Sequence, residues 1–204
     1  MKSIVLTILC ILIGYLFGSV PWGLVIGKVF YHKDIREYGS GNPGGTNAAR
    51  VLGLPAGIAV IALDALKALI AMAITHLFHP GIEQYVGLAV CIGHCFPVFA
   101  GFRGGKAVAS SYGYLLGLAL FVTHEYLYTF LIPVLVFFAV LLIFRMVSLA
   151  SMCGVTSAAV SLLIHGDTST GLLVLALAAF VIYRHSANIK RIIEHKESKI
   201  FTKK

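Results

Sequence analysis

Charged residues are scarce in this sequence. Only 12% of its 204 residues are Asp, Glu, Lys or Arg, and only eight of them are acidic. A soluble globular domain carries about 25% charged residues, so this shortage argues against water as the main solvent of the chain. The 59% share of hydrophobic residues and the mean hydropathy of +0.93 are typical of a protein that lies within a lipid bilayer.

Cysteine is also scarce, and its placement excludes a disulfide framework. Cys10, Cys91, Cys95 and Cys153 all lie in apolar stretches, where a free thiol behaves as a small hydrophobic group. Cys91 and Cys95 could form part of a metal site together with His94, but no fourth ligand follows at a spacing typical of zinc. We therefore expect neither a metal nor a cofactor.

Long apolar segments make up most of the chain. A transmembrane helix needs roughly 20 apolar residues, and the first apolar run, to Ile26, is too long for a signal peptide and lacks a cleavage pattern. We predict an all-α membrane protein, one domain over residues 1–204 with a bundle of seven transmembrane helices. The predicted spans are 4–26, 54–78, 84–101, 107–123, 127–144, 148–165 and 170–184, followed by a basic tail over 185–204.

Basic residues occupy alternate connections between these spans. Lys and Arg gather after the first, third, fifth and seventh spans, whereas the acids Glu83, Glu125 and Asp167 mark the opposite ends. Because cytoplasmic loops are rich in Lys and Arg, this alternation predicts an N-terminus outside and a C-terminus in the cytoplasm. The tail mixes basic and apolar residues over 188–193, which fits either an interfacial helix attracted to anionic lipid or a solvated helix end.

The first predicted cytoplasmic loop has an unusual composition. It combines four glycines and a proline with the polar residues Ser40, Asn42, Thr46, Asn47 and Arg50. Glycine lets backbone amides approach a ligand closely and form an anion-binding nest, and an arginine adds a bidentate fork for phosphate. A flexible connector is the alternative, but it has no need of two asparagines and an arginine.

The second predicted cytoplasmic loop ends in Gly104-Gly105-Lys106, where the fourth span begins. Glycines before a helix N-terminus form a ready anion site, and Lys106 would add a point charge. The loop is not a Walker A motif, since residue 100 is Ala where that motif needs Gly. His94 lies deeper in the third span, where a hydrogen-bonded packing role is the commoner interpretation.

Polar residues also occur at three other places in or beside the spans. Ser148 and Ser151 share a helical face, and so do His185 and Asn188. Small-residue packing is the alternative for the two serines. Asp64 and Lys67 stand three residues apart within the second span, where a structural ion pair is favoured over direct catalysis.

Four segments, GSGNPGGTNAAR, GHCFPVFAGFRGGKAVAS, VSLAS and YRHSANI, follow one another in this order and resemble the motifs of the PlsY family. The resemblance covers nearly the whole chain. It implies a seven-helix acyltransferase of the bacterial inner membrane with its active site on the cytoplasmic face. The reaction implied is transfer of a fatty acyl group from acyl-phosphate to glycerol 3-phosphate, giving 1-acyl-glycerol 3-phosphate (lysophosphatidic acid) for phospholipid biosynthesis. The partners implied are these two substrates and membrane lipids, with a soluble acyl-phosphate synthase as a further candidate and no nucleic acid.

The resemblance also implies roles for individual residues. The candidate catalytic residues are His185, Lys106 and Asn188, and the candidate substrate-binding residues are Ser40, Asn42, Thr46, Asn47, Arg50, Gly104, Gly105 and Ser148. The family usually has Gly where Ala68 and Ala107 stand here. If residue 107 needs a positive φ, Ala is unfavourable there; if it begins a helix, Ala is well suited.

Two other functions fit the sequence less well. A transporter for an organic phosphate would place ionisable residues near the middle of several spans, and only span 54–78 has them. Acyltransferases that use acyl-CoA or acyl carrier protein carry a His followed five positions later by Asp, and none of the eight histidines has an Asp there.

Overall fold

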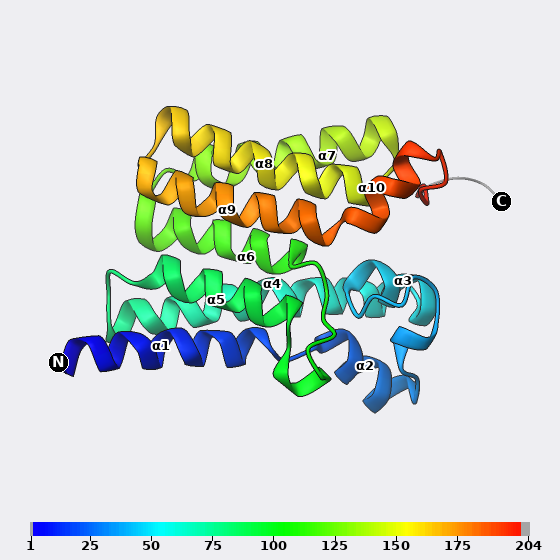
Figure 1. Ribbon diagram of the computed structural model, residues 1–204, viewed down its shortest axis with the longest axis horizontal. Helices are drawn as coiled ribbons and strands as arrows, with labels where there is room; N and C mark the ends of the chain where they lie inside the picture. The colour runs from blue at the N-terminus through cyan, green and yellow to red at the C-terminus, as the bar shows by residue number, and fades with distance from the viewer. Residues whose placement is uncertain (1, 201–204) are drawn as a thin grey trace. The chain divides into compact units, whose positions relative to one another are not determined.

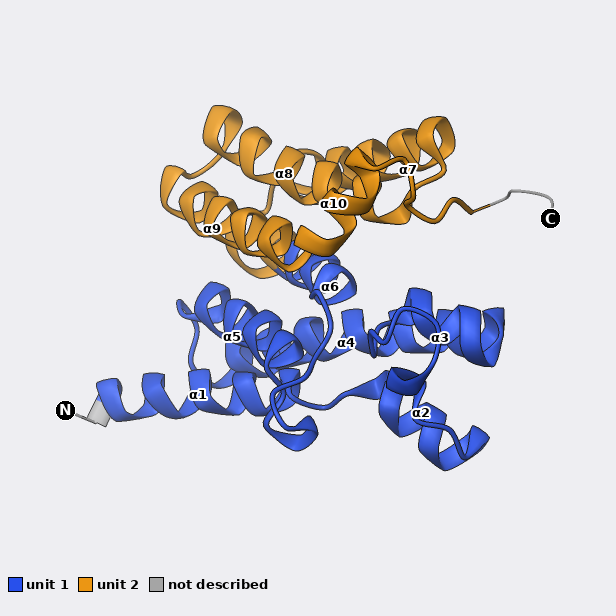
Figure 2. Cartoon of the chain, turned by 45° about the vertical axis from the view of Figure 1, so that its right-hand side comes forward, with its two compact units in different colours: residues 1–117 blue, residues 118–204 orange. Residues whose placement is uncertain are grey.

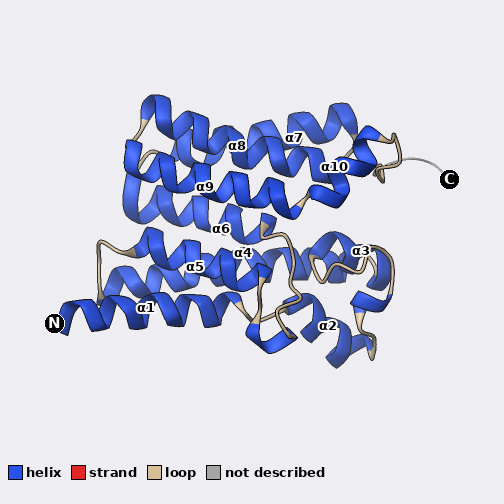
Figure 3. Ribbon diagram, viewed as in Figure 1, coloured by secondary structure: helices blue, strands red, loops and turns tan. Residues whose placement is uncertain are grey.

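The computed structural model describes residues 2–200. Met1 and residues 201–204, which include Lys203 and Lys204 of the predicted basic tail, lie outside the described residues. The described part is helical and contains no strand (Figure 3), which confirms the predicted all-α class. The chain divides into two compact units, Met1–Gly117 and Leu118–Lys204 (Figure 2), and each is described by itself.

Most helices of both units are α-helices (Figure 1), and short 3₁₀ or π segments join some of them. The elements in the first unit are α1 Lys2–Gly18, α2 Trp22–Tyr31, η1 Ile35–Glu37, α3 Gly45–Leu52, α4 Leu54–Phe78, α5 Glu83–Cys95, η2 Val98–Ala100 and α6 Val108–Leu118, whose last residue begins the second unit. The elements in the second unit are η3 Ala119–Thr123, η4 Leu127–Leu131, α7 Ile132–Phe144, α8 Val147–His165, α9 Thr168–Arg184 and α10 Ser186–Ile193.

Two of the predicted spans differ from the helices of the structure. The run over 4–26 forms two helices, α1 and α2, which meet at a bend of 41°. The break falls before Pro21, which has no backbone N–H to continue the hydrogen-bond ladder. The third predicted span, 84–101, ends early, because α5 stops at Cys95 ahead of Phe96-Pro97, where the residue before proline disfavours helix.

Three helices among the described residues are long and apolar enough to cross a membrane. They are Leu54–Phe78, Leu127–Phe144 and Val147–His165. The number rises to five if α1 with α2, and α9 with α10, each count as one bent span; the second pair is bent by 61°. Helices α5 and α6 have only 13 and 11 residues, so the count of seven spans stays a prediction.

Apolar side chains cover the outside of several helices. Helix α1 exposes leucines and isoleucines such as Leu12 and Ile13, both 52% exposed, and α7 exposes Leu142 and Ile143 at 70% and 71%. Apolar patches on this scale are unusual on soluble monomers. They fit helices that face lipid, where hydrocarbon replaces water as the solvent.

Glycines allow α1 and α5 to pack backbone against backbone. A Cβ at Gly18 would collide with the backbone of Val90, and one at Gly93 would collide with the carbonyl of Tyr15. Gly14 and Gly18 also form a Gly-x-x-x-Gly pair, an arrangement that brings membrane helices close together. This packing places the end of α5 beside the break between α1 and α2.

Candidate active site

The first loop is tied down at its start by an ion-pair cluster. Asp34 caps η1 by accepting a hydrogen bond from the backbone N–H of Arg36, and its carboxylate also accepts from the Arg36 guanidinium at 2.7 and 3.0 Å. Lys28 lies 3.3 Å from the same carboxylate. These hydrogen bonds, above all that from the Arg36 side chain, hold the pKa of Asp34 far below its usual range despite partial burial.

Asn47 holds the centre of the first loop together. Its side chain is buried, its Oδ1 accepts from the Ser40 N–H at 2.9 Å, and its Nδ2 donates to the carbonyls of Ile35 and Tyr38. Gly39 has φ +62° and leaves no room for a Cβ beside Asn47 Oδ1. The amide of Asn47 is thus engaged with the backbone of its own loop, which supports a role in shaping that loop.

The other predicted residues of this loop have different surroundings. Asn42 Oδ1 accepts from the Gly44 N–H at 2.9 Å, forming a local turn ahead of α3. Thr46 lies in the first turn of α3 and Arg50 in its last turn. Ser40, Thr46 and Arg50 are all exposed, so the structure leaves these three side chains accessible to a ligand.

The two glycines of the second loop bond to the end of α5. The N–H of Gly104 donates to the carbonyl of Cys95 at 3.2 Å, and that of Gly105 donates to the carbonyl of His94 at 3.0 Å. The sequence-based expectation that both amides face an anion therefore needs correction, because each already serves the protein's own backbone. Lys106, which is half-buried, follows directly on this anchored pair.

Ala107 adopts a left-handed backbone conformation. Its φ is +59°, and α6 begins only at Val108. Of the two alternatives open from the sequence, the positive φ is therefore the one observed. This conformation costs an L-residue roughly 1–2 kcal/mol, which accounts for the usual glycine at this place in the family that the sequence resembles.

Asp64, Lys67 and His94 form a buried polar cluster in the first unit. Lys67 Nζ lies 2.8 Å from Asp64 Oδ1 and 2.9 Å from His94 Nδ1. It also donates to the carbonyls of Gly18 and Val20 at 2.9 and 3.1 Å. The predicted ion pair of Asp64 and Lys67 is confirmed, and the His94 ring lies against both of its members, with Nδ1 3.3 Å from Asp64 Oδ1. Lys67 thus satisfies two carbonyls at the break between α1 and α2, where helical donors are missing.

Two of the predicted residues of the second unit, Ser148 and Asn188, bond to one carboxylate. Glu197 Oε1 accepts from Ser148 Oγ at 2.7 Å and from Asn188 Nδ2 at 2.6 Å, while Glu197 Oε2 accepts from Arg191 Nε at 2.7 Å. The Glu197 side chain is only 6% exposed. Burial would raise its pKa, but the hydrogen bonds from Asn188, Ser148 and Arg191 outweigh it, so the pKa of Glu197 falls below its usual value.

Sequence reasoning missed Glu197 and Arg191. The one available signal was an acidic residue within a strongly basic tail, and a solvated charge is the ordinary interpretation of such a residue. Arg191 stands three residues after Asn188, so the two share a helical face. The structure shows that the tail returns to the junction of α7 and α8, where the Ile200 N–H donates to the Arg145 carbonyl at 2.8 Å. This return brings Glu197 to the face that carries Asn188 and Arg191.

His185 is buried where α9 ends and α10 begins. Its Nδ1 lies 2.8 Å from the carbonyl of Val181. A carbonyl only accepts, so Nδ1 carries the hydrogen and, in the neutral ring, Nε2 carries the lone pair. This tautomer suits His185 to accept a proton. Ser151, by contrast, donates to the Val147 carbonyl within its own helix at 2.7 Å.

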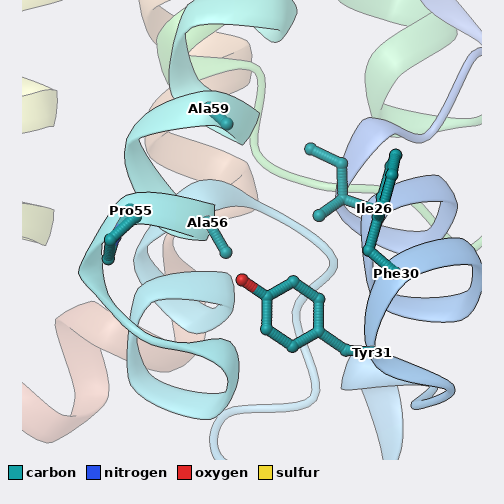
Figure 4. Close-up of a pocket in the computed structure, with 6 residues that line it drawn as sticks. All are labelled: Ile26, Phe30, Tyr31, Pro55, Ala56 and Ala59. Atoms are coloured by element: carbon teal, nitrogen blue, oxygen red, sulfur yellow. The ribbon is translucent and has the colours of Figure 1, made fainter.

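An open groove lies between α2 and α4 and has a volume of about 420 Å³. Its lining residues are drawn in Figure 4: Ile26, Phe30 and Tyr31 of α2, and Pro55, Ala56 and Ala59 of α4. Its walls are apolar apart from the Tyr31 hydroxyl, and it contains none of the predicted site residues. Its chemistry fits a hydrocarbon chain better than an anion. Among the residues that the structure describes, no three His, Cys, Asp or Glu side chains are placed to hold a metal ion.

Comparison with known proteins identifies the family. The family profile described as glycerol-3-phosphate acyltransferase matches residues 8–195. The chain belongs to this family. It is 45% identical to the glycerol-3-phosphate acyltransferase of Listeria monocytogenes, covering 95% of this chain and 96% of the relative. It is 47% identical to that of Bacillus subtilis, covering 94% and 96%.

Two solved structures of the family share the fold. Both are crystal structures of PlsY, described as an integral membrane glycerol 3-phosphate acyltransferase, in the glycerol 3-phosphate and lysophosphatidic acid forms. Each is 33% identical to this chain and covers 95% of it, with TM-scores of 0.86 and 0.83; the chain in turn covers 95% and 94% of those structures. The predicted membership in the PlsY family is confirmed, and so is the assignment to integral membrane proteins.

The left-handed conformation of Ala107 leads to a prediction about the stability of a glycine variant at this position. Ala107→Gly should leave stability unchanged or raise it by up to about 1 kcal/mol, because relief of backbone strain is partly offset by loss of a buried methyl group. The matched control Ala109→Gly, within α6, should lose about 1 kcal/mol. Thermal unfolding in detergent measures both. Equal losses in the two variants would contradict the assigned conformation.

The carboxylate of Glu197 leads to a second prediction. Glu197→Gln should lower the stability of the protein near pH 7 by about 1–2 kcal/mol, since it removes a charged acceptor of three hydrogen bonds. The lowered pKa means that this contribution is complete above the usual value of 4.5 and is lost as pH falls below it. The variant should therefore lose less stability than the unmodified protein during acidification. The control is Glu194→Gln, whose side chain is 38% exposed, and it should change the stability little. If the stability of both variants depended on pH in the same way, the role of Glu197 would be refuted.

Proposed function

We propose that this chain transfers a fatty acyl group from acyl-phosphate to the sn-1 hydroxyl of glycerol 3-phosphate, releasing 1-acyl-glycerol 3-phosphate and phosphate. The observation that carries the proposal is the likeness, over 95% of the chain, to PlsY structures in glycerol 3-phosphate and lysophosphatidic acid forms. These two molecules are the acceptor and the product of the proposed reaction. The acyl-phosphate donor and the sn-1 position rest on the four motifs.

The proposed reaction needs no covalent enzyme intermediate. Acyl-phosphate is a mixed anhydride with a good leaving group, so the glycerol hydroxyl oxygen can attack the acyl carbon directly. The bond from that carbon to the phosphate oxygen then breaks, and phosphate leaves with the electron pair. The hydroxyl proton passes either to His185 or to a phosphate oxygen of the substrate.

The protein's contribution is positioning and charge. Both substrates are anionic, and the basic side chains Arg50 and Lys106 would offset their repulsion. Ser40 and Thr46 offer accessible hydroxyls in the first loop. Asn42, Asn47, Gly104 and Gly105 contribute by shaping the loops that carry these groups. In the second unit, Ser148 and Asn188 are proposed to bind substrate or orient it, with Glu197 holding their side chains.

The donor preference is tested with purified protein in detergent. We expect turnover with acyl-phosphate and glycerol 3-phosphate, and none when acyl-CoA or acyl carrier protein replaces acyl-phosphate. Product formed without a sealed compartment also separates an acyltransferase from a transporter, which makes none. Turnover with acyl-CoA at a comparable rate would overturn the assigned donor.

Lys106 is the residue whose replacement should affect the reaction most clearly. It is half-buried beside the anchored glycines, whereas Arg103 before them is exposed. Lys106→Ala should lower kcat/KM by on the order of tenfold or more, since a hydrogen bond to a charged group contributes roughly 1.5–3 kcal/mol, while Arg103→Ala should do much less. Equal and mild effects would mean that the loop is only a basic anchor at the membrane.

We further propose a protein of the bacterial inner membrane with seven spans, its N-terminus outside and its active site on the cytoplasmic face. The alternation of basic loops supports this orientation. Exposed residues at the two faces allow a test with a thiol reagent that cannot cross membranes. Glu125→Cys should react in intact cells and Glu37→Cys only after lysis; labelling of Glu37→Cys from outside would refute the orientation.

A further inference from the structure

The glycines of the second loop are shaped to fit the end of α5. A Cβ at Gly105 would collide with His94 Nε2 and would lie 3.0 and 3.1 Å from His94 Cδ2 and Cε1. A Cβ at Gly104 would collide with Pro97 and with the carbonyl of His94. Real Cβ atoms do not occupy such positions, so the lack of side chains at 104 and 105 is explained by the protein's own packing. The imidazole of His94 thus lies directly against the backbone of Gly105.

The orientation of that imidazole is set by Lys67. His94 Nδ1 lies 2.9 Å from Lys67 Nζ and 3.3 Å from Asp64 Oδ1, so the ammonium and the carboxylate together hold the ring. Lys67 is held in turn by Asp64 at 2.8 Å and by the carbonyls of Gly18 and Val20. The side chains of Asp64, Lys67 and His94 are 2%, 4% and 9% exposed. Buried charges of this kind persist only when their partners are in place.

We infer that His94, fixed by Lys67 and Asp64, is a positioning residue that holds the Gly104–Lys106 loop in the conformation that binds the phosphate of glycerol 3-phosphate. The inference rests on the proposed function of that loop. His94 acts through Gly105 and through the two carbonyls that accept from Gly104 and Gly105. A shift of the ring displaces Gly105, and Lys106 follows in the next peptide.

The inference predicts a specific pattern in the kinetics. Displacement of the loop should raise KM for glycerol 3-phosphate and leave KM for the acyl donor within about twofold, because the inference assigns the loop to the phosphate of the acceptor. A general loss of structure would instead lower the amount of active enzyme, and with it kcat, without changing one KM alone.

The test combines a methyl group at position 105 with a smaller side chain at position 94. Gly105→Ala places a methyl group against the imidazole and should raise KM for glycerol 3-phosphate by about tenfold or more. His94→Asn keeps an acceptor oxygen where Nδ1 lies, so Lys67 stays bonded, but it removes the Nε2 and Cε1 atoms that the methyl meets. Its own effect on this KM should be about threefold, from looser packing of the loop. His94→Gln loses the acceptor near Lys67 and should be less stable than His94→Asn.

The double variant decides the matter. If the imidazole is what position 105 must accommodate, the double variant should have a KM close to that of His94→Asn alone, so the two effects will not multiply. Multiplied effects, or equal changes in both KM values, would overturn the inference. Thermal unfolding in detergent shows which variants fold. If Gly105→Ala alone does not fold but the double variant with His94→Asn does, the inference is supported. If His94→Asn alone or the double variant does not fold, the inference is refuted. An unmodified protein that does not acylate glycerol 3-phosphate would instead refute the proposed function.

Discussion

The contacts of one buried ammonium organise the first unit. Lys67 Nζ hydrogen-bonds to the carbonyls of Gly18 and Val20 and to His94, and it forms an ion pair with Asp64. Away from water, a helix can break only where other groups satisfy the carbonyls that the break releases. The ammonium does so, and Asp64 offsets the cost of burying its charge. The backbone can therefore break between α1 and α2 and bend by 41°. Helix α2 then leads into the first loop.

The same contacts reach the second loop. His94 stands at the end of α5, which packs closely on α1 through glycines, and its carbonyl and ring both meet Gly105. The break in α1–α2 and the Gly-Gly-Lys loop thus depend on one polar cluster within the first unit. In the second unit, Glu197 has a comparable role, since Ser148, Asn188 and Arg191 all donate to its carboxylate. In both units, residues named from sequence motifs rely on charged residues outside those motifs.

Helix positions were largely predictable from the sequence. The span predicted over 54–78 coincides with α4, and that over 148–165 differs from α8 by one residue, because uninterrupted apolar runs leave little choice of boundary. The bend before Pro21 and the early end of α5 were not predicted. In both cases the hydrophobicity averaged over a long apolar segment predicts one continuous helix, whereas a single proline within the segment ends the helix.

The site was predictable only in part. The ion pair of Asp64 and Lys67 follows from spacing within one helix, and the choice between two conformations for Ala107 could be posed in advance. The hydrogen-bond partners of Asn47, Gly104 and Gly105 are backbone groups, which the sequence does not distinguish from ligand groups. The contacts of His94 and Glu197 join segments 27 and 49 residues apart, and a single sequence has no signal for such pairings.

The proposed function requires that the protein recognise glycerol 3-phosphate, its acyl acceptor, through the phosphate group. Isothermal titration of the purified protein in detergent, without a donor, measures this most directly. We expect saturable binding of glycerol 3-phosphate that weakens in proportion to added inorganic phosphate, since both anions need the same charged groups. Binding that excess phosphate leaves unchanged, or no binding by folded protein, would contradict the account.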